Sequence, residues 1–159
     1  AVRATAAAAL AAVLAFLARA DDAATVLRDA LRTLDEDERN LRGWLRGELI
    51  VMGLVDLRAK ELVAEELEVA RGEEPTSPPL LAVLAYEALT GGTADEAADL
   101  ADRALQEGGL LAALPIEHPS VFFSISTLIA TDRREQAERC LDAAAASAVS
   151  SDDAYRPAV

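Results

Sequence analysis

The stretch that decides the fold is DDAATVLRDAL at residues 21–31, which reads like DEAADLADRAL at residues 95–105. Each stretch begins with two acidic residues, which favour the N-terminal end of a helix dipole. Each then places small or aliphatic side chains at positions i, i+4 and i+7. This spacing puts the three side chains on one face of an α-helix, where small residues let a neighbouring helix approach closely. The two stretches therefore predict equivalent helices of a repeat.

The same spacing recurs four times along the chain. The four triples are Ala23-Leu27-Ala30, Val63-Leu67-Ala70, Ala97-Ala101-Ala104 and Ala137-Leu141-Ala144. Successive triples are 40, 34 and 40 residues apart. Each is preceded by a complementary apolar face: Leu10-Leu14-Leu17, Ile50-Leu54, Leu84-Ala88 and Ile125-Leu128. A period of about 34–40 residues with two helices per repeat is typical of tetratricopeptide-type arrays.

Turn residues between the apolar segments predict the boundaries of eight helices. The expected helices cover about residues 2–19, 22–34, 37–52, 56–71, 79–90, 94–107, 119–130 and 133–149. Very short turns join them into antiparallel pairs at about 2–34, 37–71, 79–107 and 119–149. We therefore expect one all-α domain over residues 1–159, a tetratricopeptide-like right-handed superhelix of about four antiparallel helical hairpins. Two prolines stop a helix near residue 78, so we also expect a modest bend at residues 72–79.

Composition supports this helical prediction. The 159 residues include 36 alanines and 24 leucines, and aromatic residues make up only 4%. Residues that favour strands are sparse, which argues against β-sandwiches, barrels and doubly wound α/β sheets. Cys140 is the single cysteine, so no internal disulfide can form. With His118 as the single histidine, a zinc site made of protein ligands is very improbable.

Charge limits the classes of partner. The net charge is −13, from 28 acidic and 15 basic residues, and only Lys60 among the basic residues is a lysine. An acidic domain repels phosphate backbones, so we expect no direct binding of nucleic acid. The apolar run at residues 6–17 resembles a signal peptide, but it is too short to span a bilayer and is better interpreted as a packed helix. We expect a cytoplasmic segment of a longer protein, since the chain begins with Ala instead of Met, and no membrane partner.

Catalytic constellations are nearly absent from the sequence. His118 lies in a loop with no visible nucleophile or orienting partner. Cys140 falls on an inward helical position, where we expect a small buried hydrophobe instead of a reactive thiol. The glycine pairs at 91–92 and 108–109 lack the lysine and the spacing of a phosphate-binding loop. We therefore expect no catalytic residue, no metal, no cofactor and no enzymatic activity.

One segment, LRGWLRG at residues 41–47, is unusual for a helix. Each of its two glycines costs about 1 kcal/mol against alanine, which suggests close approach by another helix or by a ligand. First helices line the concave groove of tetratricopeptide arrays, and ordinary helix packing is the alternative role for their large side chains. The groove contacts that we expect are Arg42, Trp44, Arg46, Tyr86 and Phe123. Because Arg42 and Arg46 lie four residues apart on one face, they are a plausible anion contact.

Residues 79–148 carry a further set of features. A small-residue turn leads into an acidic helix at 91–97, and Arg-Ala-Leu at 103–105 ends that helix. A Gly-Gly-Leu-Leu segment at 108–111 and a Pro-bounded acidic loop then lead into an aromatic helix at 119–123. The next helix opens with Asp-Arg-x-Glu-x-Ala-Glu at 132–138. In these features the chain resembles the helical repeat region of large actinobacterial LuxR-type transcriptional regulators, the ATP-binding, MalT-like class, whereas residues 1–71 match only in general character.

The resemblance implies a nucleotide-binding domain before the repeats and a helix-turn-helix DNA-binding domain after them. It also implies that the repeat region senses an inducer or partner and controls the oligomeric state. This chain has neither a G-x-x-x-x-G-K-[ST] loop nor a basic recognition helix. We therefore expect a non-enzymatic sensor that binds a protein partner or small effector and forms a homo-oligomer. The alternatives are a freestanding tetratricopeptide scaffold and a helical subunit of an enzyme complex.

Overall fold

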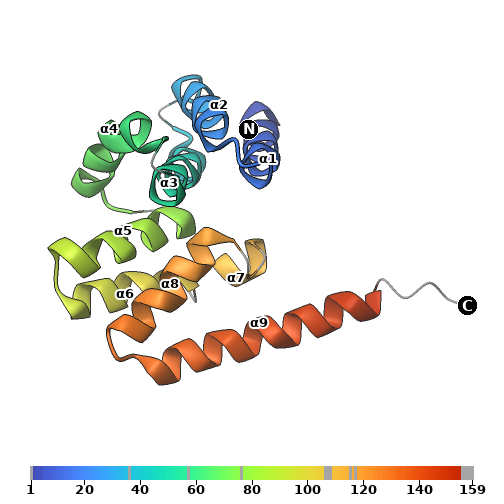
Figure 1. The fold of residues 1–159 in the computed structure, drawn as a ribbon, viewed down its shortest axis with the longest axis vertical. Coiled ribbons are helices and arrows are strands. Elements are labelled where there is room, and N and C mark those ends of the chain that lie inside the picture. Colours follow the sequence, from blue (N-terminus) through green and yellow to red (C-terminus); the bar gives the residue numbers. More distant parts are fainter. Residues whose placement is uncertain are drawn as a thin grey trace, which may run out of the picture.

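The computed structural model describes residues 2–35, 37–56, 58–75, 77–105, 109–114, 116 and 118–154, with side chains up to residue 146. Over these residues the chain is all-α, and helices pack mostly against their neighbours in sequence, with no strand (Figure 1). The helices are α1 (Val2–Phe16), α2 (Ala20–Arg32), α3 (Arg39–Val55), α4 (Lys60–Gly72), α5 (Pro78–Gly91), α6 (Ala94–Leu105), α7 (Leu110–Ala113), α8 (Pro119–Ala130) and α9 (Arg134–Ala154).

Eight of these helices lie close to the positions expected from the sequence. They pack as hairpins one to four: α1 on α2, α3 on α4, α5 on α6, and α8 on α9. The boundaries differ by a few residues. Helix α1 ends at Phe16 instead of residue 19, because Ala18 takes a left-handed φ of 56°. Helix α3 continues to Val55, and α4 begins only at Lys60.

The short helix α7 is absent from the sequence-based expectation. The Gly-Gly pair at 108–109 was expected to close a helix, but α6 already ends at Leu105, and residue 108 lies outside the described residues. Gly109 instead precedes α7 with a left-handed φ of 65°, which glycine adopts without steric cost. Leu110 then enters the core.

The expected helix starts are confirmed in two different ways. At the start of α6, which was expected at residue 94, the Thr93 hydroxyl accepts a hydrogen bond from the backbone N–H of Glu96 at 3.2 Å and so caps the helix. Helix α2 begins at Ala20 without a side-chain cap. Its acidic pair, Asp21 and Asp22, lies in the first turn, where the carboxylates favour the positive end of the dipole.

The buried core has two parts that meet at α5. One cluster joins α1 to α4 and takes in Leu80, Val83 and Phe123, and the other joins α5 to α9. Across the hairpin boundaries, α2 packs closely on α3 and α6 on α8, whereas α4 touches α5 only sparsely. The contact between α4 and α5 is therefore the weakest of these three, and it lies beside residues 72–79, where we expected a bend. The bend itself stays a prediction.

The close approach expected at the glycines of α3 is made by a helix. A Cβ added to Gly47 would lie 2.5 Å from the backbone nitrogen of Leu80 and 2.6 Å from the carbonyl carbon of Pro79. A Cβ on Gly53 would lie 2.0 Å from Val63 Cγ2, on α4. Glycine on α3 therefore lets both its own hairpin partner and the start of α5 pack against its backbone.

The repeated apolar triples are buried or half-buried except at Leu141 of α9. Ala23, Val63 and Ala97 are buried and Leu67 is half-buried, but Leu141 is 44% exposed. On α1, Leu14 is buried, whereas Leu10 and Leu17 are 49% and 58% exposed. The inward prediction was wrong for these three leucines, because in the described part of the chain no further helix covers the outer faces of α1 and α9.

Candidate functional site

Three arginines of α3 line a pocket where hairpins two and three meet. Its volume is about 470 Å³, within the range of roughly 300–1,000 Å³ that small-molecule sites occupy. We call it the arginine pocket, and its lining consists of Arg39, Arg42, Gly43, Arg46, Glu73, Glu74 and Leu80. The arginines are spaced three and four residues apart, so the helical period puts them on one face of α3. This set includes the two arginines predicted as an anion contact.

Arg46 is the buried centre of the pocket, with only 6% of the residue exposed. Its Nε donates to Glu66 Oε2 at 2.9 Å, and its Nη1 donates to Glu73 Oε2 at 2.5 Å. A buried cation has to be paired, and these carboxylates tie α4 and the residue after it to α3. The Glu73 side chain is still 52% exposed, so this carboxylate can exchange with solvent or with a ligand.

Arg42 is fixed over the connection between α2 and α3. Its Nη1 donates to the backbone oxygen of Leu34 at 2.9 Å, and the side chain is half-buried. Arg39, one turn earlier, is exposed. The pocket thus has three different guanidinium groups: that of Arg46 is buried, that of Arg42 is anchored to a backbone carbonyl, and that of Arg39 is exposed at the surface.

The three aromatic residues predicted in the groove, Trp44, Tyr86 and Phe123, are not among the residues that line the arginine pocket. The rings of Tyr86 and Phe123 pack at a centroid distance of 4.6 Å and an angle of 31°, joining α5 to α8, and Phe122 packs edge-on against Phe123. Phe123 is buried, so it contributes to the core. Trp44 is half-buried on α3. None of the three belongs to the described lining of the arginine pocket, so a common groove for all five residues stays a prediction.

The structure gives His118 a partner that the sequence did not reveal. Its Nδ1 accepts from the backbone N–H of Ser120 at 3.3 Å, and its Nε2 lies 3.2 Å from Glu48 Oε2. His118 therefore caps α8 and fastens it to α3. The Ser120 hydroxyl is fully buried, so this acid–histidine pair lacks the accessible nucleophile that a hydrolytic site needs. The only sequence signal for the pair is a single acidic residue within the apolar part of α3.

A wider groove of about 660 Å³ separates α4 from α5 and α6. Arg71 spans it, with its Nη2 2.6 Å from Glu87 Oε2 on α5, and it also pairs with Glu68 on its own helix. The hydrogen bond that Arg71 donates to Glu87 raises the pKa of this guanidinium above its ordinary value. Among the described lining residues the remaining charges are acidic, as expected for a chain of net charge −13. The charged residues of this groove are therefore mostly acidic, like those of the whole molecule, whereas the arginine pocket is lined by three arginines.

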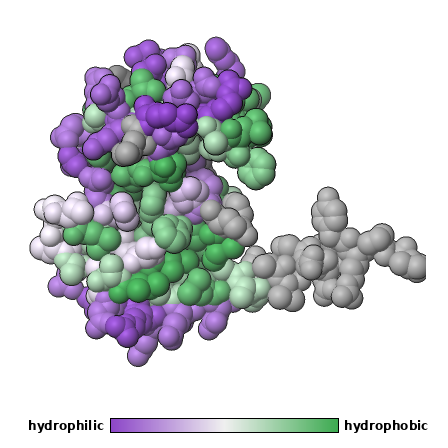
Figure 2. Space-filling view, in the orientation of Figure 1, coloured by the Kyte–Doolittle hydropathy of each residue, from purple (hydrophilic) through white to green (hydrophobic). Residues whose placement is uncertain are grey.

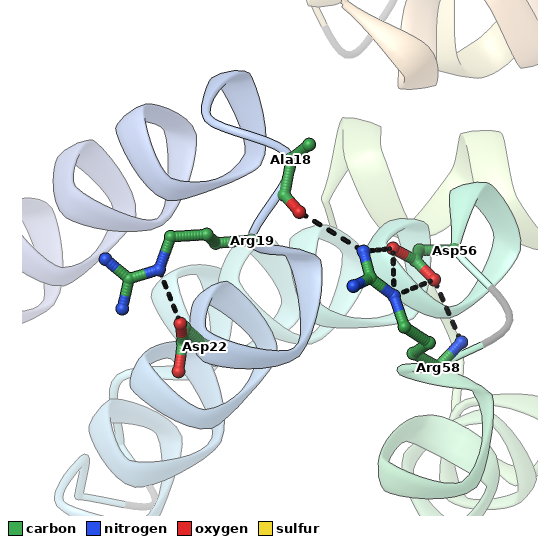
Figure 3. A network of polar contacts seen from close by, with 5 residues as sticks. All are labelled: Ala18, Arg19, Asp22, Asp56 and Arg58. Atoms are coloured by element: carbon green, nitrogen blue, oxygen red, sulfur yellow. Dashed lines mark hydrogen bonds and ion pairs between the residues drawn. The ribbon is translucent and has the colours of Figure 1, made fainter.

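A third polar network joins the turns of hairpins one and two (Figure 3). Arg58 Nη2 lies 2.6 Å from Asp56 Oδ2 and donates to the backbone oxygen of Ala18 at 3.2 Å. The hydrogen bonds from Arg58 lower the pKa of Asp56 from 3.8 to about 2. In the same view Arg19 pairs with Asp22 at 2.6 Å. These contacts fix turns and offer no cleft.

Cys140 is buried in the second core cluster, as predicted. Burial raises the pKa of its thiol, and the nearby Asp102 carboxylate raises it further. In the described part of the chain, no group of three or more His, Cys, Asp or Glu side chains is placed to hold a metal ion. Over the same residues, no helix has both the length and the apolar character required to cross a membrane.

Comparisons with models of protein families, with curated proteins and with solved structures find no match to this chain.

Proposed function

We propose that this chain is a non-enzymatic interaction module, a right-handed tetratricopeptide-like superhelix that associates with a second copy through α1. We further propose that it acts as the sensor segment of a LuxR-type transcriptional regulator. Short hairpins that pack in sequence support the repeat interpretation, since stacking neighbours is how such hairpins bury their apolar faces. The regulator assignment rests on the features of residues 79–148.

The observation that carries the proposal is the outward face of α1. Its large side chains are strongly exposed: Phe16 at 90%, and Val2, Val13, Leu10 and Leu17 beside it on the helix surface. Figure 2 shows the corresponding hydrophobic surface over α1, at the upper right of that view. Contiguous apolar surface of this kind on a folded domain marks an interaction site.

Comparison of α1 with α3 shows that the corresponding face of α3 is covered by another helix in this molecule. Helix α1 ends at Phe16 and α3 at Val55, so an offset of 39 residues aligns them. The aligned partner of Leu10 is then Leu49, which is fully buried, whereas Leu10 is 49% exposed. Helix α2 packs on α3, and no described helix takes the equivalent place on α1. The face of α1 is therefore suited to another helix.

The charge distribution favours a second copy as the occupant. Residues 1–20 contain no Asp or Glu, although the whole chain carries 28 acidic residues and a net charge of −13. Two such molecules repel each other except where acidic side chains are absent. Two α1 faces meeting about a two-fold axis would bury apolar surface at the point of lowest repulsion.

Sedimentation equilibrium at several concentrations tests this association. We expect the wild-type chain to form a dimer and Phe16→Asp to be monomeric, because the new carboxylate would be buried against an apolar partner. Leu141→Asp is the matched control, since it places the same charge on a half-exposed leucine of α9. A monomeric wild type, or equal loss of association in both variants, would contradict the proposal.

The regulator assignment has its own test in the gene. A nucleotide-binding domain encoded upstream and a LuxR-type helix-turn-helix downstream are expected. A start codon directly before residue 1 and a stop codon directly after residue 159 would refute this assignment and leave the freestanding scaffold as the better interpretation.

A further inference from the structure

Positive side chains gather on one face at the start of α3. Acidic residues occupy the first turns of α2 and α6, where they favour the positive end of the helix dipole. Helix α3 has no acidic residue in its first turn and instead carries Arg39 and Arg42 there, with Arg46 one turn later on the same face. Glu38 is the N-cap of α3, so the acidic charge at this helix start lies just before the first turn. The three arginines thus form a local cluster of positive charge in a chain of net charge −13.

These side chains surround a cavity that is large enough for a small molecule. The arginine pocket has a volume of about 470 Å³ and lies at the surface between α3 and the segment after α4. Arg42 is held in place by the Leu34 carbonyl, and Arg46 is held by Glu66. Guanidinium groups fixed in this way are preorganised, which lowers the entropy cost of forming bidentate hydrogen bonds with an oxyanion.

One protein carboxylate already occupies part of this site. Glu73 accepts a hydrogen bond from Arg46 Nη1, yet its side chain is 52% exposed. Glu73 therefore shows that an oxyanion fits against Arg46 at 2.5 Å, and its exposed side chain can turn into water when another anion takes its place on the guanidinium. Glu66, which is only 22% exposed, would stay in place and keep the buried guanidinium paired.

We propose that the arginine pocket binds a multiply charged oxyanion group, a phosphate or a di- or tricarboxylate, of a small molecule that displaces Glu73 from Arg46. The inference rests on the proposed function in that it names the chemical class of the effector. Displacement releases residue 73 from α3, and residue 73 begins the connection between hairpins two and three, since α4 ends at Gly72 and α5 begins at Pro78. Ligand binding in the pocket is thereby coupled to the connection between α4 and α5, two helices that pack only sparsely on each other.

Isothermal titration calorimetry at constant ionic strength tests the proposal, with pyrophosphate and citrate as the two probes. They share the oxyanion chemistry and separate a phosphate source from a carboxylate source. Saturable binding of either probe at one site supports the proposal. The absence of saturable binding of both below about 10 mM, a range beyond ordinary effector affinities, would overturn it.

Two substitutions of opposite expected effect make the test specific. Arg39→Gln should weaken binding about tenfold, because a charge-assisted hydrogen bond is lost at an exposed position that does not support the fold. Glu73→Gln should strengthen binding about threefold to tenfold, because the competing carboxylate is gone. Both variants are checked by circular dichroism for unchanged helicity.

Matched controls separate a site from general electrostatics. Arg134→Gln and Glu138→Gln make the same charge changes on exposed positions of α9. These controls should change affinity less than twofold, since exposed charges far from the pocket are largely screened. Equal effects in the pocket variants and the controls would overturn the proposal. The result is independent of dimerisation, because none of the four substitutions lies on α1.

Discussion

Gly47 is the position where the packing of hairpin two against hairpin three can be tested most sharply. In Gly47→Ala the new Cβ would lie 2.5 Å from the Leu80 nitrogen and 2.6 Å from the Pro79 carbonyl carbon. Ordinary contacts of this kind are about 3.5–4.0 Å long, so the overlap is roughly 1 Å. The opposing atoms belong to the backbone of α5, so relief requires movement of the whole helix start, which rotation of a side chain cannot provide.

Two effects of opposite sign determine how much Gly47→Ala changes the free energy of unfolding. Alanine in the interior of a helix is favoured over glycine by about 1 kcal/mol. Forcing an extra carbon into a well-packed contact costs about 1–3 kcal/mol, and a backbone clash belongs at the upper end of that range. The net expectation is therefore a loss of about 2 kcal/mol, which lowers the midpoint of thermal unfolding by roughly 4–8 °C.

Urea denaturation followed by circular dichroism measures this loss, and Gly91→Ala provides the matched control. Gly91 is also in a helix, but no atom lies within 4 Å of its added Cβ. The control should be as stable as the wild type or up to about 1 kcal/mol more stable. If Gly47→Ala gains stability as the control does, the close approach of α3 and α5 is refuted.

Three further predictions concern polar and reactive side chains. Arg46→Ala should lower the free energy of unfolding by about 1–3 kcal/mol, because Glu66 loses its partner in a half-buried position; unchanged thermal unfolding would contradict this. The Asp56 carboxyl should titrate by NMR with a midpoint near pH 2, and Arg58→Ala should return that midpoint towards 3.8. Because folding lowers this pKa, the stabilisation is present above the ordinary carboxyl pKa and is lost as the pH falls through about 2. A wild-type midpoint near 4 would exclude the ion pair. Cys140 should react with Ellman's reagent at least about tenfold more slowly in the native chain than in urea, since the thiol is buried and its pKa raised, and equal rates would show that it is accessible.

Much of the fold could be predicted because its signals are local. The inward triple at Ala97, Ala101 and Ala104 and the helix start at residue 94 both follow from spacing within a few residues, and both are confirmed. The burial of Leu10 and Leu141 could not be predicted correctly. A residue's apolar character indicates that it can be buried, but burial also depends on whether another helix lies beside it.

The site could be predicted only in part for the same reason. Arg42 and Arg46 lie four residues apart, so their shared face could be derived from helical geometry alone. The carboxylates that complete the network, Glu66 and Glu73, are 20 and 27 residues away from Arg46 and are brought to it by the packing of α4. The partner of His118 is Glu48, 70 residues earlier, and nothing in the local sequence pairs them.

The central claim is that α1 faces a second copy of the chain, and an isotope-filtered nuclear Overhauser experiment tests it most directly. Labelled and unlabelled chains are mixed in equal amounts, so the observed effects arise only between copies. Intermolecular effects are expected between the Val13 methyl groups and the Phe16 ring, both exposed on α1. Intermolecular effects confined to other helices, or none at concentrations where the wild type was expected to be dimeric, would contradict it.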